Sequence, residues 1–500
     1  MWNELLYAFQ EVATLPNFLA MFAGIWGGVI IGAIPGMTGT MAVTLALPFT
    51  FYLSPVTSIL LLVALYKGST YGGSISAILI KTPGTASAAC TVLDGYPLAR
   101  AGKGGKALNM ALISSCIGDF ISNISLFFLA IPLATFALRV GPPEFFMLMA
   151  FSLTIVASIS GRSLVLGIIS ACLGLLLATV GEDMYGSFRF ALSEDMKSGL
   201  GMVPVLIGLF ALPELIKMIV FRPEDNAAAM KLGDNRLTLA EFRGSIKSIC
   251  RGSIIGVILG AIPGIGPSTA AFFSYSEARR TSKNGDKFGE GEIEGIAASE
   301  SANNGACGAT MIPLLALGVP GDVITGVMLG AFMIHGLTPG PLLFQNNLGD
   351  VYALFIGILF SSVFLFVAGK ATAGAFTKIS RIPQTLLLPC ILILCVYGIY
   401  SIGASPFDVT VLLVMGVVGF AMMLLNIPAA PFLIAFILGP MFEDNMRRSL
   451  AISRGDLGVF FQSWISWGFF ALTVLFVILT IRREWKKWRD KRDASTASAN

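Results

Sequence analysis

The chain has 500 residues, of which 55% are hydrophobic and 12% are charged, and its formal net charge is +4 at neutral pH. Because so few polar side chains cannot cover a surface in water, this composition excludes a water-soluble globular protein. Apolar stretches long enough to cross the roughly 30 Å hydrocarbon core of a bilayer recur from Phe18 to Ile481. The sequence therefore predicts an all-α polytopic membrane protein with about 10–12 transmembrane helices plus broken or re-entrant half-helices.

The first sixteen residues are not expected to be a signal peptide. They contain two Glu and no Lys or Arg, so they lack the basic region of a signal peptide and are expected to remain in the mature protein. The N-terminus is expected on the periplasmic side, because no basic residue precedes the first apolar run. The seven cysteines have no metal-ligand spacing, which predicts neither a zinc site nor a disulfide framework.

A nine-residue phrase occurs twice inside apolar runs, as GVIIGAIPG at 28–36 and as GVILGAIPG at 256–264. Proline lacks an N–H group and glycine costs about 1 kcal/mol inside a helix, so Pro35 and Pro263 are predicted to break helices within the membrane. Backbone groups freed there must be satisfied by protein or by a water-filled cavity, so such breaks are expected to line a site. The residues predicted to bind substrate here are Gly36, Thr38, Thr40, Gly264, Ser268 and Thr269.

A second pair of breaks lies downstream, in GGSISAILIKTPGTAS (72–87) and NNGACGATMIPLLALGVPGD (303–322). In the first copy, separate short helices are expected at 56–66 and 70–81. Isolated small-residue motifs more often pack helices together, but two matched pairs of breaks favour a lined site. These breaks are assigned to Pro83, Gly84, Pro320 and Gly321, and further substrate-binding residues are Ser74, Ser76, Asn303 and Asn304.

The ends of broken helices suggest the chemistry of the ligand. Half-helix N-termini carry partial positive charge and unpaired N–H groups, which suit a carboxylate. Unwound carbonyls with Ser, Thr and Asn oxygens suit Na⁺. The pattern predicts an anionic substrate with a cation nearby, and a possible Na⁺ site is placed near Asn303, Asn304 and Ser268. Na⁺ or H⁺ is expected as the coupling ion, with no resident cofactor.

Ionisable residues inside apolar runs are few, and each is a functional candidate because a charge at that depth is costly. Glu300, which lies between two serines in ASESANNGA, is predicted to act in ion coupling or gating together with Ser301. Asp119 is a further candidate for this role, although a structural pair with a lysine of another helix is the preferred interpretation. The six other ionisable residues in these runs are Lys67, Lys81, Glu214, Lys217, Asp322 and His335. Four of them are expected to extend toward membrane interfaces: Lys67, Glu214, Lys217 and His335.

Basic residues predict the topology, because Lys and Arg stay on the cytoplasmic side of short loops. The tail RREWKKWRDKR, the loop ARAGKGGKAL and residues 222–251 are therefore expected inside. The first GAIPG segment is then entered from outside and the second from inside, which indicates an inverted-topology repeat. One loop disagrees, since this scheme puts Arg447, Arg448 and Arg454 outside. The predicted organisation is a first membrane repeat (1–221), a cytoplasmic linker (222–251), a second repeat (252–458), a C-terminal transmembrane helix (459–481) and a basic cytoplasmic tail (482–500).

Enzyme motifs are missing from the sequence. The single histidine, His335, has no Gly-x-Ser-x-Gly elbow to serve, so a Ser or Cys nucleophile lacks its base. Neither an HExxH motif, a CxxC motif nor a P-loop occurs, which disfavours zinc hydrolysis and ATP-driven transport within this chain. No catalytic residue is therefore predicted.

Six motifs, in this order, carry a resemblance to a known family: GAIPGMTGTMAVTLALPFTF, YGGSISAILIKTPGTASA, DGYPLARAGKGGKAL, GAIPGIGPSTAAFFSYSEARR, SESANNGACGATMIPLLALGVPGD and LGAFMIHGLTPGPLLF. Over roughly residues 18–460 the chain resembles the large transmembrane subunit of the bacterial tripartite tricarboxylate transporters, the TctA family. The resemblance implies a secondary transporter of the inner membrane that imports di- or tricarboxylates such as citrate by symport with Na⁺ or H⁺. It also implies two partners, a small four-helix membrane subunit and a periplasmic solute-binding protein.

The resemblance also assigns positions. The matched positions that would surround substrate and ions are Gly36, Thr38, Thr40, Ser74, Ser76, Pro83, Gly84, Gly264, Ser268, Asn303, Asn304, Pro320 and Gly321. Lys67, in YKGSTYGGS, stands where a less charged residue is expected, so it either touches the anion or stabilises the scaffold. Two alternatives stay open at this point: a stand-alone ion-coupled organic-anion carrier without partner subunits, and an intramembrane enzyme.

Overall fold

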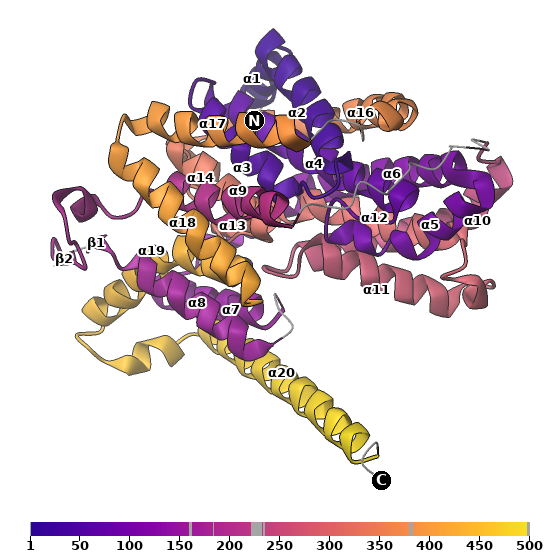
Figure 1. Ribbon diagram of the computed structural model, residues 1–500. Helices are drawn as coiled ribbons and strands as arrows, with labels where there is room; N and C mark the ends of the chain where they lie inside the picture. The colour runs from indigo at the N-terminus through magenta and orange to yellow at the C-terminus, as the bar shows by residue number, and fades with distance from the viewer. Residues whose placement is uncertain are drawn as a thin grey trace. The chain divides into compact units, whose positions relative to one another are not determined.

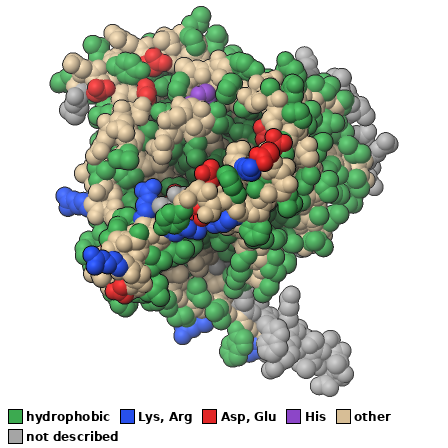
Figure 2. Space-filling model, turned by 90° about the vertical axis from the view of Figure 1, so that its left-hand side faces the viewer, with side chains coloured by type: hydrophobic (Ala, Val, Ile, Leu, Met, Phe, Trp, Pro, Cys, Tyr) green, Lys and Arg blue, Asp and Glu red, His purple; other side chains and the backbone are tan. Residues whose placement is uncertain are grey.

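The computed structural model describes residues 2–159, 163–183, 185–221, 233, 236–379 and 384–497, and these are mostly helical. Within these ranges the only strands form one short antiparallel pair, β1 (Gly181–Glu182) and β2 (Phe188–Arg189). Six of the helices there are long and apolar enough to cross a membrane, and five shorter apolar helices accompany them. Hydrophobic side chains cover much of the face seen in Figure 2, where charged side chains form small groups. The predicted all-α polytopic membrane fold is confirmed.

The chain forms two compact units, and Figure 1 labels most of their helices. Unit 1 comprises Met1–Ala137 and Gly201–Phe420, and unit 2 comprises Leu138–Leu200 and Ala421–Asn500. The helices of unit 1 are α1 (Trp2–Val12), α2 (Leu15–Ala33), α3 (Gly39–Thr50), α4 (Pro55–Ile80), α5 (Val92–Leu98), α6 (Gly104–Ala137), α9 (Met202–Val220), α10 (Leu239–Gly260), α11 (Gly266–Thr281), α12 (Ile293–Ala309), α13 (Met311–Leu317), α14 (Val323–Ile334), α15 (Leu343–Asn346), α16 (Leu348–Ile379), α17 (Gln384–Gly403) and most of α18 (Pro406–Leu424). Those of unit 2 are α7 (Pro142–Ile159), α8 (Leu164–Ala178), α19 (Ala429–Ile452) and α20 (Trp464–Ala497).

In unit 1, α2 packs backbone to backbone against α4. A β-carbon added at Gly24, Gly28 or Gly32 of α2 would lie 2.6, 2.4 or 2.3 Å from a carbonyl oxygen of α4. Gly68 and Gly72 of α4 meet α2 carbonyls at 2.4 Å in the same way. Small residues allow this close approach, which replaces side-chain contacts by backbone contacts between apolar helices.

The same packing recurs between α10 and α12, which lie side by side (Figure 1). Gly252, Gly256 and Gly260 of α10 lie 228 positions after the three glycines of α2 and again meet carbonyl oxygens, now of α12. The carbonyls met in α12 (Ala298, Ala302, Ala306) lie 237 positions after those met in α4 (Leu61, Leu65, Ser69). The repeated phrase is therefore part of a repeated helix pair.

Both GAIPG phrases interrupt their helices. Chain positions 34–38 separate α2 from α3, and positions 261–265 separate α10 from α11. The glycine after the proline adopts the same left-handed backbone in both copies, with φ +85° at Gly36 and +84° at Gly264. This conformation is costly for residues with a β-carbon, which is why glycine stands there.

The second pair of breaks also has matching geometry. Helix α4 ends at Lys81 with φ 61°, and α13 ends at Gly318 with φ 71°. Each is followed two residues later by Pro-Gly. Upstream of its break, α4 is one continuous helix rather than the two short helices expected at 56–66 and 70–81. It continues because its glycines pack on α2 and because the charge of Lys67 is paired inside the protein.

Helix α10 begins within the range predicted as a cytoplasmic linker (222–251). Thr238 and Glu241 form a capping box, in which each side chain accepts the backbone N–H of the other residue. The polar residues 239–251 are therefore the first turns of α10, not a loop. Residues 222–232 and 234–235 of the linker lie outside the described residues.

Unit 2 contains an ion-pair cluster that accounts for the basic residue Arg447. Its guanidinium lies 2.7 Å from Glu443 and 3.3 Å from Asp183, and Arg189 makes two hydrogen bonds to Glu443 of 2.8 and 3.0 Å. Hydrogen bonds from the Ser187 backbone, together with Arg447, hold the pKa of Asp183 below its usual range. The charge of Arg447 is thus matched by acids, and it meets the acidic Asp183 loop on one side of unit 2.

Candidate functional site

Three helices begin close together in unit 1. A β-carbon at Gly39, the first residue of α3, would lie 3.4 Å from Ile324 in the first turn of α14. One at Gly266, the first residue of α11, would lie 3.3 Å from Asp322, the N-cap of α14. A helix N-terminus carries partial positive charge, so three such ends together favour negative charge in this region.

These three helix starts differ in how they are capped. Thr38 accepts the N–H of Met41 in α3 (3.1 Å), and Asp322 accepts the N–H of Thr325 in α14 (2.8 Å). The other carboxylate oxygen of Asp322 accepts the hydroxyl of Tyr66 in α4 at 2.7 Å. Among the described residues no side chain caps α11, so the first-turn N–H groups of this helix are the ones open to a ligand.

The residues predicted around the two GAIPG phrases lie within reach of the surface. Gly36 and Thr269 are exposed, and the remaining four are half-buried: Thr38, Thr40, Gly264 and Ser268. The two breaks of the second repeat are joined directly, since the N–H of Gly264 donates to the carbonyl of Gly321 at 2.8 Å. An accessible set of helix ends thus forms the outer part of the candidate site.

The predicted residues Ser74 and Ser76 lie elsewhere, fully buried in α4. The hydroxyl of Ser76 donates to the carbonyl of Gly73 in its own helix at 3.0 Å, and that of Ser74 donates to Glu300 at 2.6 Å. The glycine of the nearby break is also enclosed, because a β-carbon at Gly84 would lie 1.9 Å from the Gly32 carbonyl oxygen. In this conformation these positions build the scaffold.

Glu300 lies at the centre of a fully buried hydroxyl cluster. One carboxylate oxygen accepts Ser74 and Thr91, and the other accepts Ser115 of α6 at 2.9 Å. Its neighbour Ser301 donates to the Ala298 carbonyl of its own helix. A buried carboxylate is stable only with such donors, and the donors of Glu300 come from α4, α6 and the residue before α5.

A second buried cluster surrounds Asp119 of α6. Lys67 of α4 pairs with it at 3.1 Å and also donates to Ser361 and the Ile358 carbonyl of α16, at 3.0 and 2.7 Å. The structural pair expected for Asp119 is present, and its partner is Lys67. Both side chains are fully buried, so Lys67 does not extend to an interface. Of the two options for this lysine, the structure shows the scaffold contact.

Asn303 and Asn304 of α12 are fully buried, and neither amide oxygen nor nitrogen of either side chain has a hydrogen-bond partner among the described residues. Three more buried oxygens without a partner lie on α6: Asp119 Oδ1, Ser122 Oγ and Asn123 Oδ1. Such groups cost about 1–3 kcal/mol each when nothing satisfies them. Because these unsatisfied groups are concentrated on two facing helices, α6 and α12, the contact between these helices is a candidate binding site for a polar ligand.

Several of these residues could not be predicted from the sequence. Tyr66, Thr91 and Ser115 meet their acidic partners only through tertiary packing. A signal existed for Asn123, since GDFISN puts it one helical turn after Asp119, and for the serine pair 361–362 in an otherwise apolar run. Of the remaining ionisable candidates, Glu214 and Lys217 pair with each other at 3.3 Å on α9.

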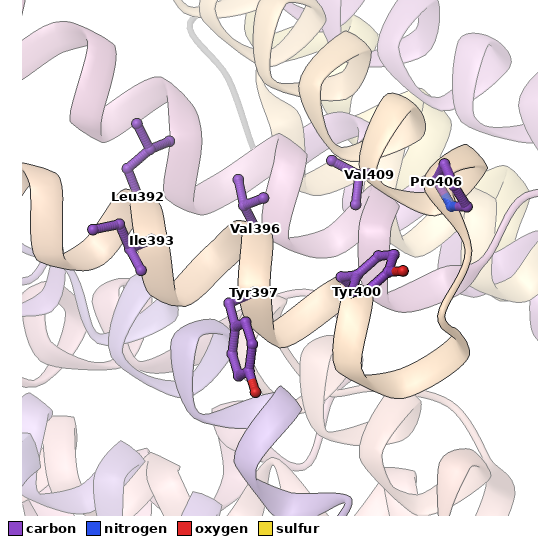
Figure 3. A pocket seen from close by; sticks show the side chains of 7 residues that line it. All are labelled: Leu392, Ile393, Val396, Tyr397, Tyr400, Pro406 and Val409. Carbon is purple, nitrogen blue, oxygen red and sulfur yellow. The ribbon is translucent and has the colours of Figure 1, made fainter.

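A separate groove of about 630 Å³ lies on α17 and the start of α18, and Figure 3 shows the side chains that line it. It is lined by Leu392, Ile393, Val396, Tyr397, Tyr400, Pro406 and Val409. These side chains carry no charge and the walls are almost entirely apolar, so the groove offers no counter-charge to an organic anion. The predicted anion-binding residues are not among its lining.

A bundle of apolar helices with Pro-Gly interruptions around buried ionisable groups defines a polytopic membrane transporter. A family model described as "Tripartite tricarboxylate transporter TctA family" matches residues 18–434, and the chain belongs to this family.

Two relatives come from Agrobacterium vitis. The chain is 35% identical over 481 residues, 96% of each protein, to an uncharacterized 52.8 kDa protein in the TAR-I ttuC' 3'region. It is 37% identical over 226 residues, 45% of this chain and 93% of the relative, to an uncharacterized protein in the TAR-II ttuC' 3'region. No solved structure matches the chain.

Proposed function

We propose that the chain is the permease subunit of a secondary transporter that imports di- or tricarboxylate anions across the bacterial inner membrane, driven by a Na⁺ or H⁺ gradient. It works with a small four-helix membrane subunit and a periplasmic solute-binding protein, as the family's three-part assemblies imply. The observation that carries the proposal is the convergence of helix starts from both repeats, α3 and α11, on the start of α14.

The relation between the repeats supports alternating access. Thr70 of α4 and Cys307 of α12 occupy equivalent positions, 237 apart, and their side chains are 3.4 Å apart. Four residues further along α4, Ser74 meets Glu300, which precedes Cys307 in α12. The equivalent helices α4 and α12 therefore run in opposite directions where they meet. A two-fold axis across the helices, and hence in the membrane plane, relates halves of this kind.

In this mechanism the binding protein delivers the anion to the periplasmic face. The uncapped N–H groups at the start of α11 hold a carboxylate, the positive end of the capped helix α3 lies nearby, and the hydroxyls of Thr40 and Ser268 are beside them. Binding of the coupling cation in the core favours inward opening. The N-terminus lies on the periplasmic side and the C-terminus in the cytoplasm in this scheme.

Uptake into proteoliposomes tests the function. Liposomes with the chain and its small subunit, given binding protein and either radiolabelled citrate or a radiolabelled dicarboxylate, should accumulate label only when a Na⁺ or H⁺ gradient is imposed. Uptake without binding protein would instead favour a stand-alone carrier, and turnover of substrate without any gradient would favour an enzyme.

A matched pair of variants on one helix tests the site. Ser268→Ala, in the first turn of α11, should lower uptake at least tenfold while insertion stays normal. Ser276→Ala is the control, because that exposed hydroxyl donates only to the Phe272 carbonyl of its own helix, at 2.9 Å. Equal uptake by the two variants would remove the first turn of α11 from the substrate site.

A further inference from the structure

The two carboxylate oxygens of Asp119 differ in the number of hydrogen bonds that they accept. Its Oδ2 accepts hydrogen bonds from Lys67, Asn123 and Ser362, at 3.1, 3.1 and 2.5 Å. Its Oδ1, also buried, accepts none from the described residues. A charged oxygen without a donor in a low-dielectric interior is among the most costly arrangements in a protein, and a cation relieves it.

Two neighbouring side chains of α6, Ser122 and Asn123, also have a buried oxygen without a hydrogen-bond partner among the described residues. The amide nitrogen of Asn123 donates to Asp119 and Ser362 and also lies 3.4 Å from the Ile358 carbonyl, whereas its oxygen has no partner among the described residues. A β-carbon on Gly308 of α12 would lie 2.7 Å from that oxygen and 2.8 Å from the free hydroxyl of Ser122. Both oxygens therefore lie at the contact between α6 and α12.

The register of these helices brings Asn304 to the same level. Gly118 of α6 lies against the Ser301 carbonyl, and Ser122 lies against Gly308, so the two helices run parallel here. Ser115 of α6 meets Glu300 of α12, and Asp119 and Asn304 each lie four residues, about one helical turn, further along their helices. The unpartnered amides of Asn303 and Asn304 thus come from α12 toward the level of Asp119 Oδ1.

We infer that this junction binds one sodium ion, held by Asp119 Oδ1 and by neutral oxygens of Ser122, Asn123, Asn303 and Asn304. Hard cations prefer oxygen ligands. One carboxylate with several neutral oxygens suits a monovalent ion, and no cluster of three or more Asp, Glu, His or Cys occurs in the described part of the chain to hold a divalent one. A proton would need only one of these oxygens. In their usual charge states Lys67, Asp119 and Glu300 sum to −1, which a single Na⁺ neutralises.

This inference rests on the proposed function, since it assigns sodium as the coupling ion of the proposed transporter. It also places the sodium site at a different position from the one predicted from the sequence. The sequence pattern predicts a Na⁺ site near Asn303, Asn304 and Ser268. Ser268 instead lies half-buried at the start of α11, beside the proposed anion site. Lys67 then acts as a fixed cation that shares Asp119 with the sodium ion.

Sodium binding can be measured without substrate or partners. The purified full-length chain is titrated with NaCl against choline chloride at constant ionic strength, with the thermal unfolding midpoint and ²²Na⁺ binding as readouts. A ligand that binds only the folded state raises the midpoint with its concentration, so the wild type should show a saturable rise. Ser122→Ala and Asn304→Ala should each raise the half-saturating sodium concentration at least tenfold.

Ser125→Ala is the matched control on α6, because that hydroxyl donates to the Ile121 carbonyl of its own helix at 2.8 Å. It should titrate like the wild type. Lys67→Met should gain more from sodium than the wild type, because Asp119 then has no other cation. The proposal is overturned if the wild type shows no sodium dependence, as buried waters alone would give, or if Ser122→Ala and Asn304→Ala both titrate like Ser125→Ala.

The two proposals fail separately. If sodium binds at Asp119 but the chain accumulates no carboxylate under any gradient, the ion site is supported and the transport function is contradicted. If a gradient drives carboxylate uptake but Ser122→Ala and Asn304→Ala titrate with sodium like the wild type, the transport function is supported and the ion site is contradicted.

Discussion

Lys81 shows how one residue departs from the repeat. It adopts φ 61° and ψ 14° at the end of α4, where the second repeat has Gly318. A left-handed conformation costs a residue with a β-carbon about 1–2 kcal/mol. The exposed ammonium lies 5.6 Å from the centre of the Tyr96 ring, a contact worth at most about 0.5–1 kcal/mol at an exposed site.

Lys81→Gly should raise the thermal unfolding midpoint by at most the equivalent of about 1 kcal/mol, the margin left when about 2 kcal/mol of strain is set against about 0.5 kcal/mol each for the lost ring contact and the added chain entropy. Gly318→Ala, at the equivalent position, should lower the midpoint. Thermal unfolding of both variants in the same detergent measures the difference. A lower midpoint for Lys81→Gly would show that its side-chain contacts outweigh backbone strain.

At the scale of the element, the capping box of α10 makes stability depend on pH. Burial alone would raise the pKa of Glu241, but hydrogen bonds from Lys106 and Thr238 hold it at about 2. A carboxyl whose folded pKa is depressed stabilises the fold above its usual pKa of 4.5, and this contribution is lost as pH falls toward 2. Because the side chain is 32% exposed, screening reduces the contribution to about 1 kcal/mol.

Glu241→Gln should then unfold at a lower temperature than the wild type at pH 6, and the two midpoints should converge as pH is lowered from 5 to 3. Thermal unfolding across this range measures the difference. A constant offset at every pH would mean that the variant removes packing rather than a charged cap.

At the scale of the whole molecule, the repeated helix pair predicts matched sensitivities. Gly28→Ala and Gly256→Ala should both destabilise the protein by about 1–3 kcal/mol, since each new methyl group would overlap a carbonyl oxygen of the facing helix. Gly27→Ala and Gly244→Ala are the controls, because one meets a neighbour at 3.4 Å and the other meets nothing within 4 Å. Thermal unfolding should separate the pairs; tolerance at Gly256 but not at Gly28 would argue against equivalent packing.

Patterns within one segment could be predicted from sequence. The apolar composition predicted the all-α membrane fold, and the repeated phrase indicated where α2 and α10 are interrupted. Contacts between distant segments could not be predicted in this way. Lys67 and Asp119 are 52 positions apart and Glu300 meets Ser74 across 226, so only tertiary packing reveals these partners. The same holds for Asn303 and Asn304. Their polar side chains could be recognised in the sequence, but the burial of their amides without a hydrogen-bond partner could not.

The contact between Thr70 and Cys307 has a consequence for movement. A two-fold rotation leaves every point on its axis in place. Such a point therefore does not move if the two halves exchange conformations during a transport cycle. In the inverted arrangement proposed above, these two side chains, which touch at equivalent positions, lie next to such a point. The centre of α4 and α12 would then serve as the stationary pivot, with displacement growing toward the outer ends of both helices.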